Sequence, residues 1–385
     1  MVQDASAIST ALQENVSNPS YKKLMEEQEE IITTRKGYAL KDLAYSFTVS
    51  LSEAGPSASG KLLHYTADMI CSGGLHLWQR LCWDHAFEHI GIASPRIFVY
   101  LQKKFRELNE VHAKFPFEVF CKKPEVQQGT VEVVLILQTC SRKTKVKMPV
   151  VPKETHMNSD WLNSVLRATD KASVRKVWDQ SQDLPELLHA SNELIAACIE
   201  GATEKALFWM RWIIEEDSML RKKLGGGLTN MDRGPATLGT RQRSHPGFYL
   251  CAILAETYKE LAEKYQIRMH EEYQILLDIY RSPDKTITPR RKMDCIILLI
   301  HILTDVPRWK VPAAPSLVKD PVVLQRAVAQ AEAFYREILM LPPPQKHLPN
   351  KVGSLKPKKK NSKQDELEDH LNDMDKIIMD FYGVK

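Results

Sequence analysis

Apolar residues recur along most of the chain at the three- and four-residue spacing that is typical of amphipathic helices. Ser94 followed by Pro95 is a typical helix start, and Gly91 is a typical helix end. From Trp161 onward one segment of helical length follows another, and short polar stretches separate them. The pattern predicts a mainly all-α fold, either a multi-helix bundle or an irregular α-solenoid, in which no period identifies a repeat family.

One segment fits more than one type of secondary structure. Residues 130–140 are rich in β-branched side chains, which favours a strand. Pro124, followed by a polar stretch, favours the start of a helix instead. We interpret the segment as a helix because of that start, with a strand as the alternative.

The segments that interrupt the helical pattern predict how the chain divides. The first residues are polar, the stretch after residue 140 is basic and contains prolines, and the stretch after residue 341 is rich in proline and lysine. The predicted organisation is a disordered N-terminus (1–19), an N-terminal helical domain (20–140), a basic connector (141–158), a C-terminal helical domain (159–341), a Pro/Lys-rich tether (342–362) and an acidic amphipathic helix (363–385).

The composition is that of a globular protein rather than a disordered chain, with 43% hydrophobic and 26% charged residues among 385. Seven cysteines lie far apart and none forms a CxxC pair, which predicts reduced thiols in the cytoplasm or the nucleus. The first twenty residues lack the features of a signal peptide, and the most apolar run, residues 295–306, is too short to span a bilayer. We therefore expect an intracellular protein that does not enter a membrane.

Two short motifs resemble cofactor-binding or catalytic sites. Residues 55–62, GPSASGKL, nearly match the phosphate-binding P-loop, but Leu62 stands where that loop needs a hydroxyl group for Mg²⁺. His85, Glu88 and His89 match the HxxEH pattern of inverted zinc proteases, in which a helix presents two histidines on one face. No third zinc ligand can be identified, so we favour an interhelix loop that leads into a helix for the first motif and polar histidines on a helix face for the second.

No nucleophile elbow, Rossmann glycine motif or cysteine–histidine zinc framework occurs in the sequence. These absences favour a non-enzymatic protein that uses no cofactor. An enzyme whose site is built from dispersed residues stays an alternative.

Positive charge is concentrated in a few segments, although the formal net charge is only +5. A mobile glycine-rich loop that carries arginines can wrap around phosphates, and a tryptophan between two cations can stack on a base. The alternative is a set of solvated loops. The candidate nucleic-acid-binding residues are Arg221, Lys222, Lys223, Arg233, Arg241, Arg243, Arg290, Arg291, Lys292 and Trp309.

The last forty residues carry an interaction signal of another kind. After a lysine cluster at residues 356–360, typical of nuclear localisation or phosphate binding, apolar residues recur at helical spacing with acidic residues between them. Such a tethered helix suits the groove of a protein partner, or folds back onto the chain's own basic surface. Residues 375–382 also resemble the docking box that binds sliding clamps, with Asp375 in place of the expected glutamine. The candidate partner-binding residues are Leu371, Met374, Ile378, Phe381 and Tyr382.

Three segments of the C-terminal half, residues 200–223, 268–282 and 306–328, resemble a conserved, uncharacterised protein family of large nucleocytoplasmic DNA viruses, and the resemblance extends back to residues 93–105. It implies a role in viral DNA replication, late gene expression or particle assembly, in the host cell or the virion, and carries over no functional residue. We expect a non-catalytic helical adaptor that binds protein partners, with nucleic acid as a further partner at its basic loops. The alternative is a structural or scaffold component of a virus particle.

Overall fold

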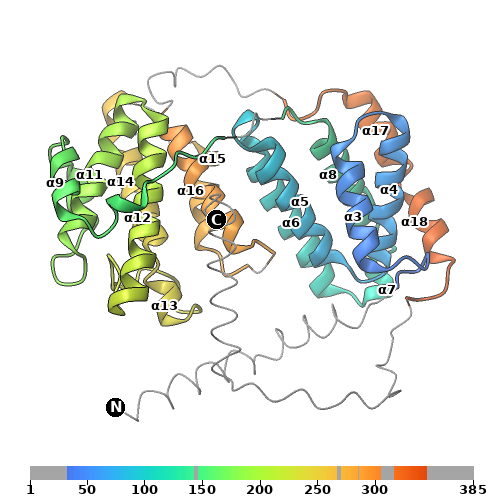
Figure 1. Cartoon of the computed structure of the whole chain (residues 1–385). Helices are drawn as coiled ribbons and strands as arrows, with labels where there is room; N and C mark the ends of the chain where they lie inside the picture. The colour runs from blue at the N-terminus through green and yellow to red at the C-terminus, as the bar shows by residue number, and fades with distance from the viewer. Residues whose placement is uncertain (1–32, 143–145, 267–269, 285, 305–315, 345–385) are drawn as a thin grey trace, which may run out of the picture. The chain divides into compact units, whose positions relative to one another are not determined.

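The structure of the chain is a computed structural model, and it describes residues 33–142, 146–266, 270–284, 286–304 and 316–344 (Figure 1). The regular secondary structure of these residues is helical, which confirms the predicted all-α fold. They form two compact units: the first combines the two outer parts of the chain, and the second is built from its middle.

The first unit is a helical bundle, and several of its helices begin or end at the serine, glycine and proline residues that interrupt the sequence pattern. Pro56 and Pro124, for example, occupy the first turns of their helices, where a missing N–H has no cost. Its helices are α3 (Leu40–Ser52), α4 (Pro56–Cys71), α5 (Leu75–His85), a π-helical turn (Ala86–Ile90), a 3₁₀ turn (Gly91–Ala93), α6 (Arg96–Lys114), α7 (Phe117–Phe120), α8 (Pro124–Thr139), α17 (Pro321–Ala329) and α18 (Ala331–Leu339).

Helix α8 is the most enclosed element of the first unit. It packs against α3, α4, α5, α6, α17 and α18, and its residues from Val131 to Leu137 are buried except Glu132. A helix that is covered on several sides needs apolar residues around most of its circumference, which explains the strand-like composition of this segment. The interpretation of residues 130–140 as a helix is confirmed.

The two helices nearest the C-terminal end of the described chain belong to the first unit. Helix α18 packs against α4 and α8, and the Tyr335 hydroxyl lies 2.6 Å from the Thr130 hydroxyl. The buried Arg35 donates from Nη1 to the Leu341 carbonyl at 3.2 Å. The prediction that a C-terminal helical domain extends over residues 159–341 is therefore wrong at its end, because the apolar face of α18 finds its partners among the N-terminal helices.

The second unit is organised around the helical hairpin of α11 (Pro185–Glu200) and α12 (Thr203–Leu224), which lie side by side (Figure 1). Gly201 forms the turn with a φ of 74°, and a Cβ atom there would lie 3.2 Å from the Thr304 carbonyl oxygen. Glycine is therefore favoured by both conformation and space. The remaining helices are a 3₁₀ turn (Lys153–Thr155), α9 (Ser159–Val165), α10 (Ala172–Val177), α13 (Thr240–Arg243), α14 (Pro246–Tyr265), α15 (Glu271–Arg281) and α16 (Pro289–Thr304).

Three further predictions concern the cysteines, membrane-spanning helices and the two ends of the chain. All seven cysteines are free and buried, as the dispersed pattern indicated. None of the helices in the described ranges combines the length and the apolarity needed to cross a bilayer. The predicted disordered N-terminus (1–19), most of the tether (342–362) and the acidic helix (363–385) lie outside the described residues.

Candidate binding pocket

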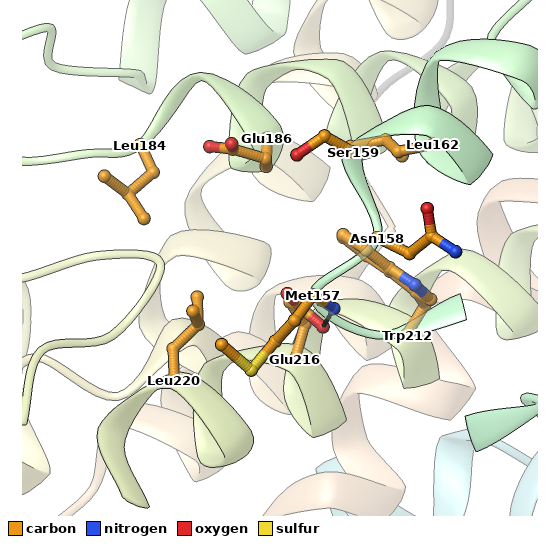
Figure 2. Close-up of a pocket in the computed structure, with 9 residues that line it drawn as sticks. All are labelled: Met157, Asn158, Ser159, Leu162, Leu184, Glu186, Trp212, Glu216 and Leu220. Atoms are coloured by element: carbon orange, nitrogen blue, oxygen red, sulfur yellow. Dashed lines mark hydrogen bonds between the residues drawn. The ribbon is translucent and has the colours of Figure 1, made fainter. Parts of the chain in front are cut away.

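A pocket of about 190 Å³ lies in the second unit, where the segment before α9 runs along α12 (Figure 2). Three parts of the chain that are distant in sequence meet there: the segment from residue 157 to α9, the start of α11, and the middle of α12. The side chains that line it are Met157, Asn158, Ser159, Leu162, Leu184, Glu186, Trp212, Glu216 and Leu220.

Helix geometry aligns the α12 side of the pocket. Trp212, Glu216 and Leu220 follow one another at four-residue spacing, so they share one face of the helix. On the opposite side, Glu186 lies in the first turn of α11 (Figure 2). The start of α9 is fixed by Asn158, whose side chain accepts a hydrogen bond from the Trp161 amide at 2.9 Å.

The wall between α9 and α12 is held by hydrogen bonds to Glu216. The Met157 amide donates to Glu216 Oε1 and Oε2, both at 3.0 Å. His156 Nδ1 lies 2.9 Å from Glu216 Oε2, and its Nε2 lies 3.3 Å from Glu215 Oε2. Met157 itself has a φ of 52°, a left-handed conformation that is uncommon for a residue other than glycine.

Two glutamates of α12, Glu215 and Glu216, are each paired with a cationic side chain. Burial lowers the pKa of His156 and is the largest single influence, but hydrogen bonds to Glu215 and Glu216 and the charges of both carboxylates together raise that pKa to about 9. His156 is therefore a cation at neutral pH. Buried Arg211 donates to Glu215 at 2.6 Å and to the Pro149 carbonyl at 2.7 Å. The two glutamates thus face two cations.

Glu186 differs from the glutamates on α12. Its side chain is only partly exposed at the pocket, and it has neither a hydrogen bond nor an ion pair with any described residue. Met157 and Leu184 are exposed to 40% and 39%, although both are apolar.

The size of the pocket favours one side chain of a bound segment as its occupant rather than a cofactor. Its volume of about 190 Å³ is below the roughly 300–1,000 Å³ that is usual for cofactor and drug-sized sites.

The HxxEH residues lie in the first unit and form a different environment from a zinc site. Helix α5 ends at His85, and a π-helical turn continues through His89, which places the two rings 4.7 Å apart between centroids. Burial, with the charges of His89 and Arg142, lowers the pKa of His85 to about 3. In the described ranges, no group of three or more histidine, cysteine or acidic side chains is arranged to hold a metal ion. The expectation of polar histidines on a helix face is wrong for His85, whose ring is buried.

The P-loop-like motif is a helix start rather than a phosphate-binding loop. Helix α4 begins at Pro56, so Gly60 and Lys61 lie inside its first turns. The backbone amides around them point along a helix and do not form the cradle that a nucleotide phosphate needs.

The arginines around the glycine-rich segment after α12 bind acidic side chains of the second unit. Arg221 donates from Nε to Asp217 at 2.6 Å and from Nη2 to the Ser244 carbonyl at 2.9 Å. Arg233 forms an ion pair with Asp183, whose side chain is fully buried. Arg243 donates to Asp232 at 2.6 Å. These guanidinium groups hold the segment in place instead of presenting a free basic surface.

The other candidate nucleic-acid-binding residues are divided between the interior and the surface. Arg291 is buried and forms an ion pair of 3.1 Å with Asp294. Lys292 donates to the Ser282 carbonyl at 2.5 Å, and burial lowers its pKa. Lys222, Lys223 and Arg290 are exposed. Trp309, the Arg241 side chain and the candidate partner-binding residues Leu371, Met374, Ile378, Phe381 and Tyr382 lie outside the described part of the chain.

The pocket was missed by the sequence analysis because none of its residues belongs to a motif. The sequence signals that point to it are weak: a tryptophan, a glutamate and a leucine at four-residue spacing, and a leucine directly before Pro185. Neither signal shows that the two segments meet.

The resemblance to a family of large DNA viruses rests on the segments quoted above and stays a prediction. The chain matches no protein-family model, no curated protein and no solved structure.

Proposed function

We propose that the chain is a non-catalytic helical adaptor that holds a segment of a protein partner in the pocket between α9, α11 and α12. The observation that carries the proposal is the pocket itself, with apolar Met157 and Leu184 exposed beside it. An exposed apolar rim around a cavity of side-chain size is typical of a site that anchors one residue of a partner.

The titratable groups near the pocket favour binding over catalysis. Both ring nitrogens of His156 are engaged with glutamates, and its raised pKa keeps it protonated, so it is a poor general base. Glu216 already accepts bonds from His156 and from the Met157 amide. These groups serve to hold the wall of the pocket in position.

A peptide selection tests the proposal on the full chain. A phage library of random 12-residue peptides is selected against it, and enriched peptides are synthesised for fluorescence anisotropy. We expect Leu184→Ser to weaken binding by about fivefold or more, since a buried apolar contact contributes about 1 kcal/mol or more. Ile199→Ser is the matched control, because Ile199 lies near the end of α11, is exposed to 41%, close to the 39% of Leu184, and does not line the pocket.

Two outcomes would contradict the proposal. Peptides that bind the Leu184 and Ile199 variants equally well would use another surface. A chain that selects no peptide but associates with itself through this face would favour the alternative role as a scaffold component.

A further inference from the structure

We infer that the pocket selects a lysine or arginine side chain of the partner segment. The inference rests on the proposed function and specifies the chemistry of the residue that the pocket takes. It follows from the charges that line the pocket, from its size, and from the cost of covering a carboxylate.

The first argument is the balance of charge. Two carboxylates, those of Glu186 and Glu216, line the pocket, and none of its lining residues is a cation. Glu216 is compensated by His156, whereas Glu186 has no hydrogen bond or ion pair within the described residues. The N-terminal end of α11 stabilises the charge of Glu186 without cancelling it, so a bound segment meets a carboxylate that has no cationic side-chain partner among the described residues.

The second argument is the shape of the lining. Figure 2 places Glu186 on one side of the pocket and Met157, Glu216 and Leu220 on the other. The volume of about 190 Å³ is below the roughly 300–1,000 Å³ of sites for drug-sized ligands, which favours a single side chain as the occupant. The apolar residues can cover the methylene stem while the charged end reaches Glu186.

The third argument compares the other occupants. A purely apolar side chain would cover the Glu186 carboxylate without giving it a partner, which costs free energy. An acidic side chain would add electrostatic repulsion, and for that reason the chain's own acidic segment, residues 363–385, is a poor occupant. A cationic side chain buries the same apolar surface and also pairs with the carboxylate.

The probe is a set of four peptide pools, random except for a central lysine, arginine, methionine or glutamate, immobilised and incubated with the labelled full chain. We expect the lysine and arginine pools to retain about threefold more chain than the methionine pool, in line with the ~0.2–1 kcal/mol of a partly exposed ion pair. Raising the salt concentration should reduce this preference. The glutamate pool should retain least.

Variants of Glu186 separate a charge effect from a loss of folding. Glu186→Gln should remove the preference, and Glu186→Lys should shift it to the glutamate pool, which an unfolded chain cannot do. Glu204→Gln is the control, since Glu204 lies in the first turn of α12, as Glu186 lies in the first turn of α11, but does not line the pocket. It should behave as the unaltered chain does.

Each remaining outcome overturns the inference in a recognisable way. Equal retention of the methionine and lysine pools, lost in Leu184→Ser, would refute cation selection and leave the proposed function intact. Retention by no pool, both for the unaltered chain and for one in which lysines 356, 358, 359 and 360 are replaced by serine, would refute both. Binding that emerges only after lysines 356, 358, 359 and 360 are replaced by serine would assign the pocket to the chain's own basic cluster rather than to a partner.

Discussion

The charge on His156 depends on two neighbouring glutamates at once. Its ring bridges Glu215 and Glu216 on α12, and the Met157 amide uses the same Glu216 carboxylate. The ion pair therefore fixes the backbone at the position where the chain forms one wall of the pocket. A neutral His156 ring would lose its ion pairs with both glutamates.

The raised pKa of His156 predicts a pH dependence of stability. The pKa is about 9 in the folded chain and about 6.5 in an unfolded one, so folding favours the protonated ring. The stabilisation is present in full below pH ~6.5 and is lost as the pH rises through ~9. The difference in unfolding free energy between the chain and His156→Gln, from urea titrations, should fall by about 1–2 kcal/mol between pH 6 and 10 after allowance for screening. A difference that does not change with pH would show that the ring is neutral.

Met157 allows the pocket wall to be changed without unfolding the chain. Its left-handed φ costs a non-glycine residue about 1–2 kcal/mol, which Met157→Gly removes while adding freedom to the unfolded chain. We expect stability in urea to change by less than about 1 kcal/mol, and affinity for a selected peptide to fall because one apolar wall is gone. Met231→Gly, at an exposed apolar residue outside the pocket lining, is the binding control.

Among single residues, the sequence pointed to a short motif that forms no site and gave no sign of the residues that line the pocket. The HxxEH spacing is real, but a π-helical turn follows His85, and within the described residues no third histidine, cysteine or acidic side chain joins the motif to hold a metal ion. Glu186 and Glu216 stand in no motif, and they meet only because α11 and α12 pack as a hairpin. Local patterns describe such residues, but their meeting depends on tertiary packing.

Among the elements, the segment between α12 and α14 differs most from its predicted role. Its glycines and arginines predicted a mobile loop for phosphates, whereas buried Asp183 and Asp217 bind Arg233 and Arg221. A Cβ atom on Gly227 would lie 2.1 Å from Asp217 Oδ1, so the glycine permits a close approach rather than mobility. The four-residue spacing of Asp217 and Arg221 on α12 can be read from the sequence, but the sequence does not show that Asp183, from the segment before α11, reaches Arg233.

Removing one of these arginines should therefore affect folding before it affects any ligand. Arg233→Gln leaves the buried Asp183 carboxylate without its ion pair, which typically costs about 3–5 kcal/mol. Lys223→Gln, at an exposed residue in the last turn of α12, should change stability by less than about 0.5 kcal/mol. Urea unfolding followed by circular dichroism measures both. An Arg233→Gln chain of unchanged stability that no longer binds labelled DNA would restore the nucleic-acid interpretation.

In the whole molecule, the order of helices along the chain differs from their grouping in space. The sequence places a boundary near the basic connector, and the change from the first to the second unit occurs there. It gives no sign that α17 and α18 return to the first unit, because a hydrophobic face shows that a helix is covered and not which helices cover it. Helix α18 buries Ala331, Tyr335 and Ile338 completely, and their partners lie on α4 and α8.

This grouping predicts which unit is destabilised when the C-terminal part of the chain is removed. A chain that ends at residue 344 keeps α17 and α18, whereas a chain that ends at residue 315 exposes the faces of α4 and α8 that α18 covers. Hydrogen exchange followed by mass spectrometry should show lost protection in α4 and α8 of the shorter chain, with α11 and α12 unchanged. Lost protection in α11 and α12 instead would mean that residues 316–341 stabilise the second unit, as the helical domain predicted over residues 159–341 requires. The chain that ends at residue 344 is the control for the loss of residues 345–385. Both chains lack those residues, so a difference between them comes from residues 316–344.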